Sequence, residues 1–250
     1  MLTLFSSRTV VFQVQDWSVT WYGLLFLSGF VLAYWWLPRL QHKRGLKLSR
    51  QQWFEIVVWS AVGAIIGGRL GYALWYEPAF YFTHSWQLVL LRGGGMASHG
   101  GFIGAGLALW LLSRRYQVPA LKLFDVVVVA AAVGLALGRL GNVINQELFP
   151  TIAAQVIGVS SNLIVAGVSY YHLSFVRRAR PGQTTALGLI LYGWLRLGVE
   201  LVRDQPWSYT LGLTRGQLLT VPLLLFGCWL WLYLRRRVKP LDLWARLAEA

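Results

Sequence analysis

The sequence is poor in charged residues and in cysteine. Only 13% of its 250 residues are charged and 56% are hydrophobic, a composition too apolar for a soluble fold of this size. The single cysteine, Cys228, lies within an apolar run and excludes an intrachain disulfide. No hydrophilic stretch is long enough for a second domain, and no internal repeat is present. We therefore predict one membrane-embedded domain over residues 1–250.

Acidic residues are also scarce: nine stand against 23 Lys and Arg, which gives a net charge of +14. In a soluble protein this surplus would suggest a nucleic-acid partner. Here the cations fall in short loops between apolar runs, so we predict no nucleic-acid binding and interpret the pattern as a signal of membrane orientation.

About 20 helical residues are needed to cross ~30 Å of hydrocarbon. Windows of this kind lie near residues 19–38, 53–73, 97–113, 122–141, 152–174, 184–202 and 217–234. The first window lacks a basic segment before it and a cleavage pattern after it, so we expect a span and not a removed signal. These windows predict an all-α, polytopic membrane protein with seven transmembrane helices.

Orientation follows from where the cations lie. Lys and Arg number five in 38–50, three in 113–122, three in 176–183 and five in 235–250, with only a handful in the N-terminus and the other three loops. The positive-inside rule places the crowded loops in the cytoplasm. The N-terminus is then outside and the C-terminus cytoplasmic, which agrees with an odd number of spans.

Glycines recur inside the spans, as in Gly63-xxx-Gly67-xxx-Gly71 and Gly134-xxx-Gly138. Missing side chains let helix backbones approach closely, so this spacing predicts tight helix packing.

Polar residues in the outward half of the spans need a specific reason. The run Gly138-Arg139-Leu140-Gly141-Asn142-Val143-Ile144-Asn145-Gln146-Glu147 ends an apolar window with an arginine, amides and an acid. An arginine within hydrocarbon costs about 2.5–3.5 kcal/mol even on insertion scales, so such residues normally face a protein interior, a wet cavity or a ligand. We interpret this run as one wall of a site for a lipid headgroup.

Two further groups lie at the same predicted depth. Arg69 is near the outer end of the second span, where it could also extend to the interface. The segment Gly93-Gly94-Gly95-Met96-Ala97-Ser98-His99-Gly100-Gly101 leads into the third span, where backbone N–H groups and a helix N-terminus suit an anion. His99 is a candidate general base, although a membrane histidine can equally be a packing residue. No histidine has metal-ligand spacing, and we predict no metal site and no cofactor.

The sixth span carries a polar stripe. Tyr192, Arg196, Glu200 and Arg203 are spaced by four, four and three residues, which places them on one face of a helix. Arg196 and Glu200 could pair simply to lower each other's insertion cost. Several arginines at one depth still exceed the nearby acids, and the planar guanidinium suits phosphate oxygens better than an ammonium does. We therefore expect an anionic ligand.

These residues resemble the prolipoprotein diacylglyceryl transferases of bacterial inner membranes. The matching pieces are Trp21-Tyr22-Gly23, Gly67-Gly68-Arg69-Leu70-Gly71-Tyr72, Gly94-Gly95-Met96-Ala97-Ser98-His99-Gly100-Gly101, Asp125, Gly138-Arg139-Leu140-Gly141-Asn142 with Ile144-Asn145 and Glu147, and Tyr192-Gly193 with Arg196, Glu200 and Arg203. Their order and their positions in the spans agree over nearly the whole chain.

The resemblance implies an inner-membrane enzyme that moves the diacylglyceryl group of phosphatidylglycerol onto the lipobox cysteine thiol in a preprolipoprotein signal peptide, releasing glycerol phosphate. It implies catalytic roles for His99, Arg139 and Arg196. The residues implied in substrate binding are Tyr22, Arg69, Gly94, Gly95, Gly100, Asn142, Asn145, Glu147, Tyr192, Glu200 and Arg203.

The chain departs from the family pattern after Glu147. Residues 148–150 run almost directly into Ile152, where the family has a sizeable outer segment, and Ile157 and Gly158 replace a tyrosine and a glutamate. We therefore expect a divergent member with a shortened outer head region. A noncatalytic phospholipid-binding relative, a relative with another acceptor and a lipid transporter or flippase remain alternatives.

Overall fold

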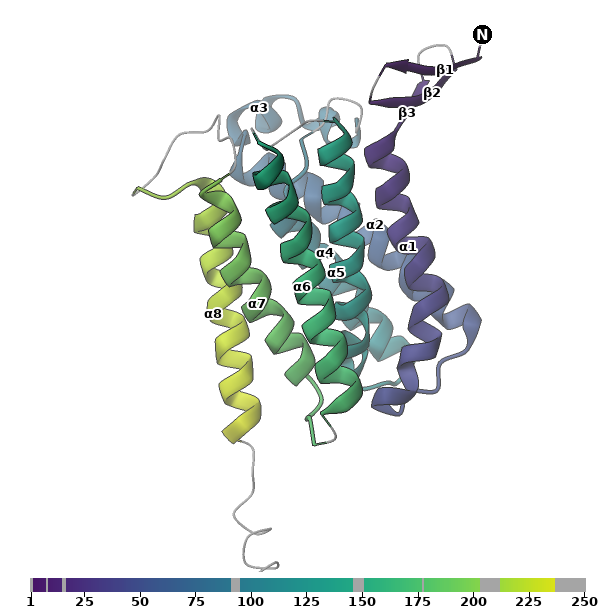
Figure 1. Cartoon of the computed structure of the whole chain (residues 1–250), viewed down its shortest axis with the longest axis vertical. Coiled ribbons are helices and arrows are strands. Elements are labelled where there is room, and N and C mark those ends of the chain that lie inside the picture. Colours follow the sequence, from purple (N-terminus) through teal and green to yellow (C-terminus); the bar gives the residue numbers. More distant parts are fainter. Residues whose placement is uncertain are drawn as a thin grey trace, which may run out of the picture.

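The computed structural model describes residues 2–7, 9–14, 17–90, 95–145, 151–176, 178–202 and 212–236. The elements in chain order are β1 (Leu2–Ser7), β2 (Val10–Val14), β3 (Trp17–Thr20), α1 (Trp21–Leu40), η1 (Gln41–Arg44), α2 (Arg50–Trp75), α3 (Pro78–Thr83), η2 (Ser85–Val89), α4 (Ser98–Arg115), α5 (Ala120–Asn145), α6 (Ile152–Phe175), α7 (Gln183–Glu200) and α8 (Arg215–Arg236). The long helices run up and down in one bundle (Figure 1).

Each of the seven predicted windows coincides with one of the long helices, α1, α2 and α4–α8, within a few residues at either end. In the part of the chain that the structure describes, five helices are long and apolar enough to cross a membrane: those at Trp21–Arg44, Arg50–Trp75, Ala120–Asn145, Ala154–Phe175 and Arg215–Arg236. The chain is therefore a helical, polytopic membrane protein. The helices outside this set, α4 and α7, have 18 residues each and carry the polar residues singled out above.

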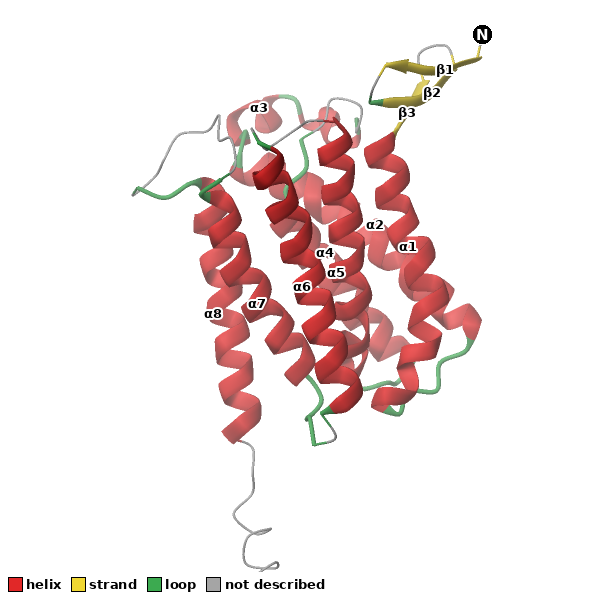
Figure 2. Ribbon diagram, viewed as in Figure 1, coloured by secondary structure: helices red, strands yellow, loops and turns green. Residues whose placement is uncertain are grey.

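Short elements that the sequence analysis did not predict lie at one end of the bundle. Strands β1, β2 and β3 form an antiparallel sheet in that order, directly before α1, and α3 and η2 follow α2 (Figure 2). We call this end of the bundle the sheet end. The loops rich in Lys and Arg, which follow α1, α4 and α6, gather at the opposite end, the basic end (Figure 1).

Close helix contacts depend on glycine, as its spacing predicted. A Cβ added to Gly67 would lie 2.3 Å from the Gly100 carbonyl oxygen, and one added to Gly104 would lie 2.0 Å from that of Gly63. Helices α2 and α4 therefore touch backbone to backbone. Helices α1 and α5 do the same, because a Cβ on Gly29 would lie 2.8 Å from the Gly134 Cα.

The basic end is fixed by a buried ion pair. Arg44 Nε lies 2.8 Å from Asp125 Oδ2, and both side chains are almost fully buried. The Asp125 carboxylate also accepts hydrogen bonds from the backbone N–H groups of Gly182 and Thr185, at 2.8 Å each, and so caps the start of α7 from a neighbouring helix. The largest buried apolar cluster, which includes Trp53 and Leu123, packs around this end.

Candidate functional site

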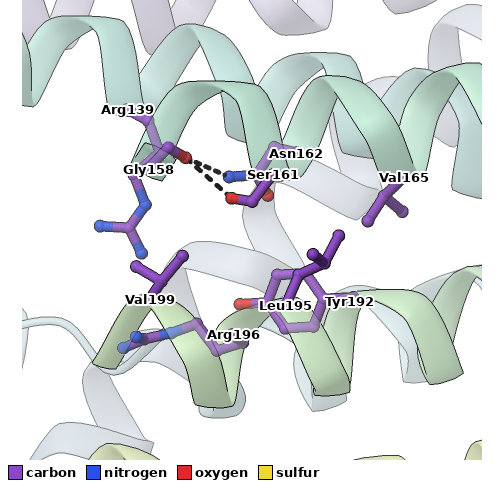
Figure 3. A pocket seen from close by; sticks show the side chains of 9 residues that line it. All are labelled: Arg139, Gly158, Ser161, Asn162, Val165, Tyr192, Leu195, Arg196 and Val199. Atoms are coloured by element: carbon purple, nitrogen blue, oxygen red, sulfur yellow. Dashed lines mark hydrogen bonds between the residues drawn. The ribbon is translucent and has the colours of Figure 1, made fainter. Parts of the chain in front are cut away.

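A cavity opens between α5, α6 and α7 toward the sheet end. Its described lining consists of Arg139 from α5; Gly158, Ser161, Asn162 and Val165 from α6; and Tyr192, Leu195, Arg196 and Val199 from α7. Its cavity volume is about 10 Å³, which is about the space that one water molecule needs. Figure 3 shows both guanidinium groups at the same end of the cavity, with the Tyr192 hydroxyl pointing toward that end.

The described lining contains two arginines, of which Arg196 is paired with Glu200, a residue outside the lining. Planar guanidinium groups can donate paired hydrogen bonds to the oxygens of an anion such as a phosphate.

Arg196 is held by an ion pair within its own helix. Its guanidinium donates to Glu200 Oε2, one turn further along α7, and both side chains are buried. Thr214 Oγ1 donates to the other carboxylate oxygen, Oε1, at 3.1 Å. Arg196 Nε is buried and has no hydrogen-bond partner within the ranges that the structure describes, which leaves a donor for a ligand.

Helix α8 makes room for this ion pair. A Cβ added to Gly216 would lie 2.3 Å from Glu200 Oε1, so only glycine fits beside the carboxylate. Thr214 precedes the helix and bonds reciprocally with Gln217, its N–H to the Gln217 side chain and its hydroxyl to the Gln217 N–H. This cap fixes the first turn of α8 against Glu200.

His99 stands in the first turn of α4 and is buried. Its Nε2 lies 3.0 Å from Thr220 Oγ1 on α8. The ring packs edge-on against Phe102, with centroids 6.3 Å apart, and Phe102 packs edge-on against Tyr192 of the cavity lining at 5.2 Å. His99 is therefore one aromatic layer away from the cavity and is absent from its described lining.

The predicted residues of α5 and α1 lie beside this region. Asn142 is buried one turn after Arg139, and Asn145 is the last residue of α5. A Cβ on Gly141 would lie 2.7 Å from the Tyr22 Cα, so α1 and α5 touch at this level. Tyr22 itself is 39% exposed.

Arg69 is positioned differently from the two cavity arginines. Its guanidinium donates to four backbone carbonyls that follow α3: Gln87 at 2.8 Å, Leu88 at 3.2 Å, Leu90 at 2.5 Å and Gly95 at 3.1 Å. The group also lies over the Tyr81 ring, 5.3 Å from its centroid. These hydrogen bonds stabilise the segment that leads into α4.

The glycines of this segment have distinct surroundings. Gly95 has φ +77° and lies against Tyr72 and Arg69, where a Cβ would come within 2.7 Å of the Tyr72 ring. Gly100 lies at the α2–α4 contact, where a Cβ would approach the Gly67 carbonyl oxygen to 2.2 Å. Gly94, Glu147 and Arg203, also predicted to bind substrate, lie outside the described residues.

Sequence reasoning missed two parts of the site. Ser161 and Asn162 both donate to the Gly158 carbonyl, at 3.0 Å each, and line the cavity (Figure 3). Their only signal in the sequence is that they are polar residues within the apolar window at 152–174. Thr220 and Gly216 of α8 carried a weaker signal, a threonine and a glycine four residues apart near the start of an apolar run.

Together, the fold and the cavity define a polytopic helical membrane protein with an arginine-lined cavity near one end of its bundle. The family model described as prolipoprotein diacylglyceryl transferase matches residues 9–233. The chain belongs to the prolipoprotein diacylglyceryl transferase family.

Similar proteins from several bacteria carry the name phosphatidylglycerol–prolipoprotein diacylglyceryl transferase. A protein of Legionella pneumophila is 37% identical over 92% of this chain and 98% of its own length. Proteins of Methylobacillus flagellatus and Wolbachia pipientis are 34% and 32% identical, each over 91% of this chain and 97% and 95% of their own lengths.

Proposed function

We propose that this protein transfers the diacylglyceryl group of phosphatidylglycerol to the lipobox cysteine of a preprolipoprotein. The observation that carries the proposal is the convergence of Arg139 from α5 and Arg196 from α7 on one cavity. The names of its relatives supply the two substrates, phosphatidylglycerol and a prolipoprotein.

The reaction needs a base and a cationic clamp. The cysteine sulfur attacks a saturated glyceryl carbon, a C–S bond forms, and the C–O bond to the phosphate breaks. The thiol gives up its proton, and the departing glycerol phosphate gains one negative charge. Arg139 and Arg196 hold the phosphate and stabilise this growing charge, since electrostatic stabilisation is strong in a site closed to water.

His99 is the proposed base. It takes or relays the thiol proton, and its layered contact with Phe102 and Tyr192 keeps it next to the cavity. Glu200 holds Arg196 in place. The proposed headgroup contacts are Tyr22, Asn142, Asn145 and Tyr192, while Arg69, Gly95 and Gly100 shape the entry into α4. Roles for Gly94, Glu147 and Arg203 remain predictions from the family resemblance.

The proposal includes the orientation of the protein in the membrane. All seven long helices span the bacterial inner membrane as one domain, with the sheet end outside and the basic end in the cytoplasm. The gathering of the Lys- and Arg-rich loops at one end supports this orientation (Figure 1). Phosphatidylglycerol then reaches the cavity from the outer leaflet, where a translocated signal peptide presents its cysteine.

The direct test is mass spectrometry of a lipobox peptide incubated with purified protein and phosphatidylglycerol. The expected product is the peptide with a diacylglyceryl thioether, formed together with glycerol phosphate. His99→Gln and Arg139→Ala should abolish the product while the protein stays folded. Arg114→Ala provides the matched loss of a cation far from the cavity and should leave transfer unchanged.

Two outcomes would reject parts of the proposal. Full activity of either site variant would remove the role assigned to that residue. Binding of phosphatidylglycerol without any transfer by the wild-type protein would identify a noncatalytic relative, and lipid flux in reconstituted vesicles without product would identify a transporter.

A further inference from the structure

The environment of His99 determines which of its two ring nitrogens can accept a proton. Within the described ranges, the ring makes one hydrogen bond, from or to Thr220 Oγ1 at 3.0 Å. Both residues are buried, and Thr220 is completely enclosed within the bundle. The direction of this hydrogen bond decides the tautomer of the neutral ring.

The direction follows from the second contact of the Thr220 hydroxyl. Its Oγ1 lies 2.6 Å from the Gly216 carbonyl oxygen, one turn earlier in α8. A carbonyl can only accept, and two oxygens this close need a proton between them. A hydroxyl has a single proton, so Thr220 donates it to Gly216. Its lone pairs then face His99, and Nε2 must be the donor.

We infer that Thr220 is a positioning residue that holds neutral His99 as the Nε2–H tautomer, so that Nδ1 carries the lone pair that accepts the substrate proton. The last step rests on the proposed function, whereas the tautomer itself rests only on the two hydrogen-bond distances. A histidine that acts as a base must begin as the neutral ring. When the cysteine sulfur forms its bond to carbon, the thiol proton passes to Nδ1, directly or by relay, and the phosphate leaves with the C–O electron pair.

The first turns of α8 also contact Glu200, which holds Arg196. Thr214 bonds to Glu200, and Gly216 leaves space for that carboxylate while its carbonyl accepts from Thr220. One short stretch, residues 214–220, thus orients the proposed base through Thr220 and the Arg196 clamp through Glu200. A shift of this helix end would disturb both groups together.

The first experiment reads the tautomer directly. Nitrogen-15 NMR of histidine-labelled protein in nanodiscs distinguishes protonated from unprotonated ring nitrogens, and the His99→Gln variant assigns the His99 signal among the four histidines. The expected spectrum shows Nε2–H in the wild type and a mixture of tautomers in Thr220→Val. A wild-type ring with its proton on Nδ1 would overturn the inference, whether or not the protein proves to be a transferase.

The second experiment separates positioning from stability. Thr220→Val should lower kcat about 10- to 100-fold with little change in KM for phosphatidylglycerol, because a misplaced base slows only the proton transfer. Thr220→Ser keeps the hydroxyl and should restore kcat to within about threefold. Ser113→Ala is the matched control, since it removes a buried hydroxyl that donates to the Trp110 carbonyl in α4 without touching His99.

Two results would contradict the positioning role. One is a folded Thr220→Val protein with wild-type kcat and an unchanged tautomer. The other is an equal loss of kcat in Thr220→Ser and Thr220→Val, because a hydroxyl in the same place would then have failed to rescue activity. If neither the wild type nor any variant transfers lipid, the NMR result still decides the tautomer.

Discussion

Glu200 occupies a space that exists because residue 216 has no side chain. Its carboxylate receives Arg196 on one oxygen and Thr214 on the other, deep in the bundle. A buried carboxylate held by two donors has little freedom to move without losing one of them. The position of Arg196 at the cavity therefore depends on a glycine in another helix.

Gly216→Ala tests this dependence. The new Cβ would lie 2.3 Å from Glu200 Oε1, so the carboxylate must shift and the Arg196 guanidinium with it. We expect transfer activity to fall by tenfold or more, on the scale of a misplaced charged group in an active site. Gly198→Ala in α7, where nothing lies within 4 Å of the added Cβ, should retain wild-type activity. Equal activities of the two variants would disprove the coupling.

Arg69 differs from the cavity arginines because the protein itself uses its donors. A lysine at this position keeps the charge but cannot bond four carbonyls spread over residues 87–95. Arg69→Lys should therefore speed backbone hydrogen exchange of residues 85–90 and 95–97, measured by mass spectrometry. If exchange stays at the wild-type rate while KM for phosphatidylglycerol rises, Arg69 acts on the lipid and not on this segment.

At the scale of whole elements, α7 is fixed at both ends by acids. Glu200 lies at its last turn in the site, and Asp125 of α5 caps its first turn at the basic end. In the sequence, Asp125 is distinguished only as one position that matches the family. In the structure its carboxylate pairs with Arg44 and accepts a hydrogen bond from Thr185, and so connects α5 to Arg44 and to the start of α7.

Asp125→Asn should destabilise the protein without affecting the chemistry of the site. Removal of one partner of a buried pair leaves Arg44 uncompensated, a change that typically costs about 3–5 kcal/mol. Thermal unfolding in detergent micelles should show a large fall in Tm, while kcat per folded molecule stays close to wild type. Glu55→Gln is the control, because Arg115, its partner at 3.6 Å, is 65% exposed and such pairs contribute about 0–1 kcal/mol. Similar Tm values for the two variants would contradict the assigned role.

For the molecule as a whole, the positions of the long helices could be predicted because each apolar run is about the length that a bilayer requires. The glycine contacts between α2 and α4 followed from their spacing. Arg139 and Arg196 could be singled out because an arginine in an apolar window is costly without a specific environment. The structure places both at one cavity, which spacing within separate helices could not establish.

Other features of the fold could not be predicted, because they depend on tertiary contacts that produce no periodic pattern in the sequence. The strands at residues 2–20 are short and carry no distinctive turn pattern, and α3 and η2 are single short turns between long helices. The pairing of His99 with Thr220 joins residues 121 positions apart. Arg69 lies in an apolar window, as Arg139 and Arg196 do, so the sequence does not distinguish it from them. Only the fold shows that its guanidinium donates to backbone carbonyls.

We propose that Arg139 and Arg196 together hold one phospholipid headgroup. Native mass spectrometry can test this by measuring phosphatidylglycerol bound to the wild type, Arg139→Gln, Arg196→Gln and the double variant. If both groups hold the same phosphate, each single change should weaken binding strongly and the double change should add little to it. Retained affinity in either single variant would show that this arginine does not hold phosphatidylglycerol, and losses that add up in the double variant would show that the two arginines do not act together on one phosphate.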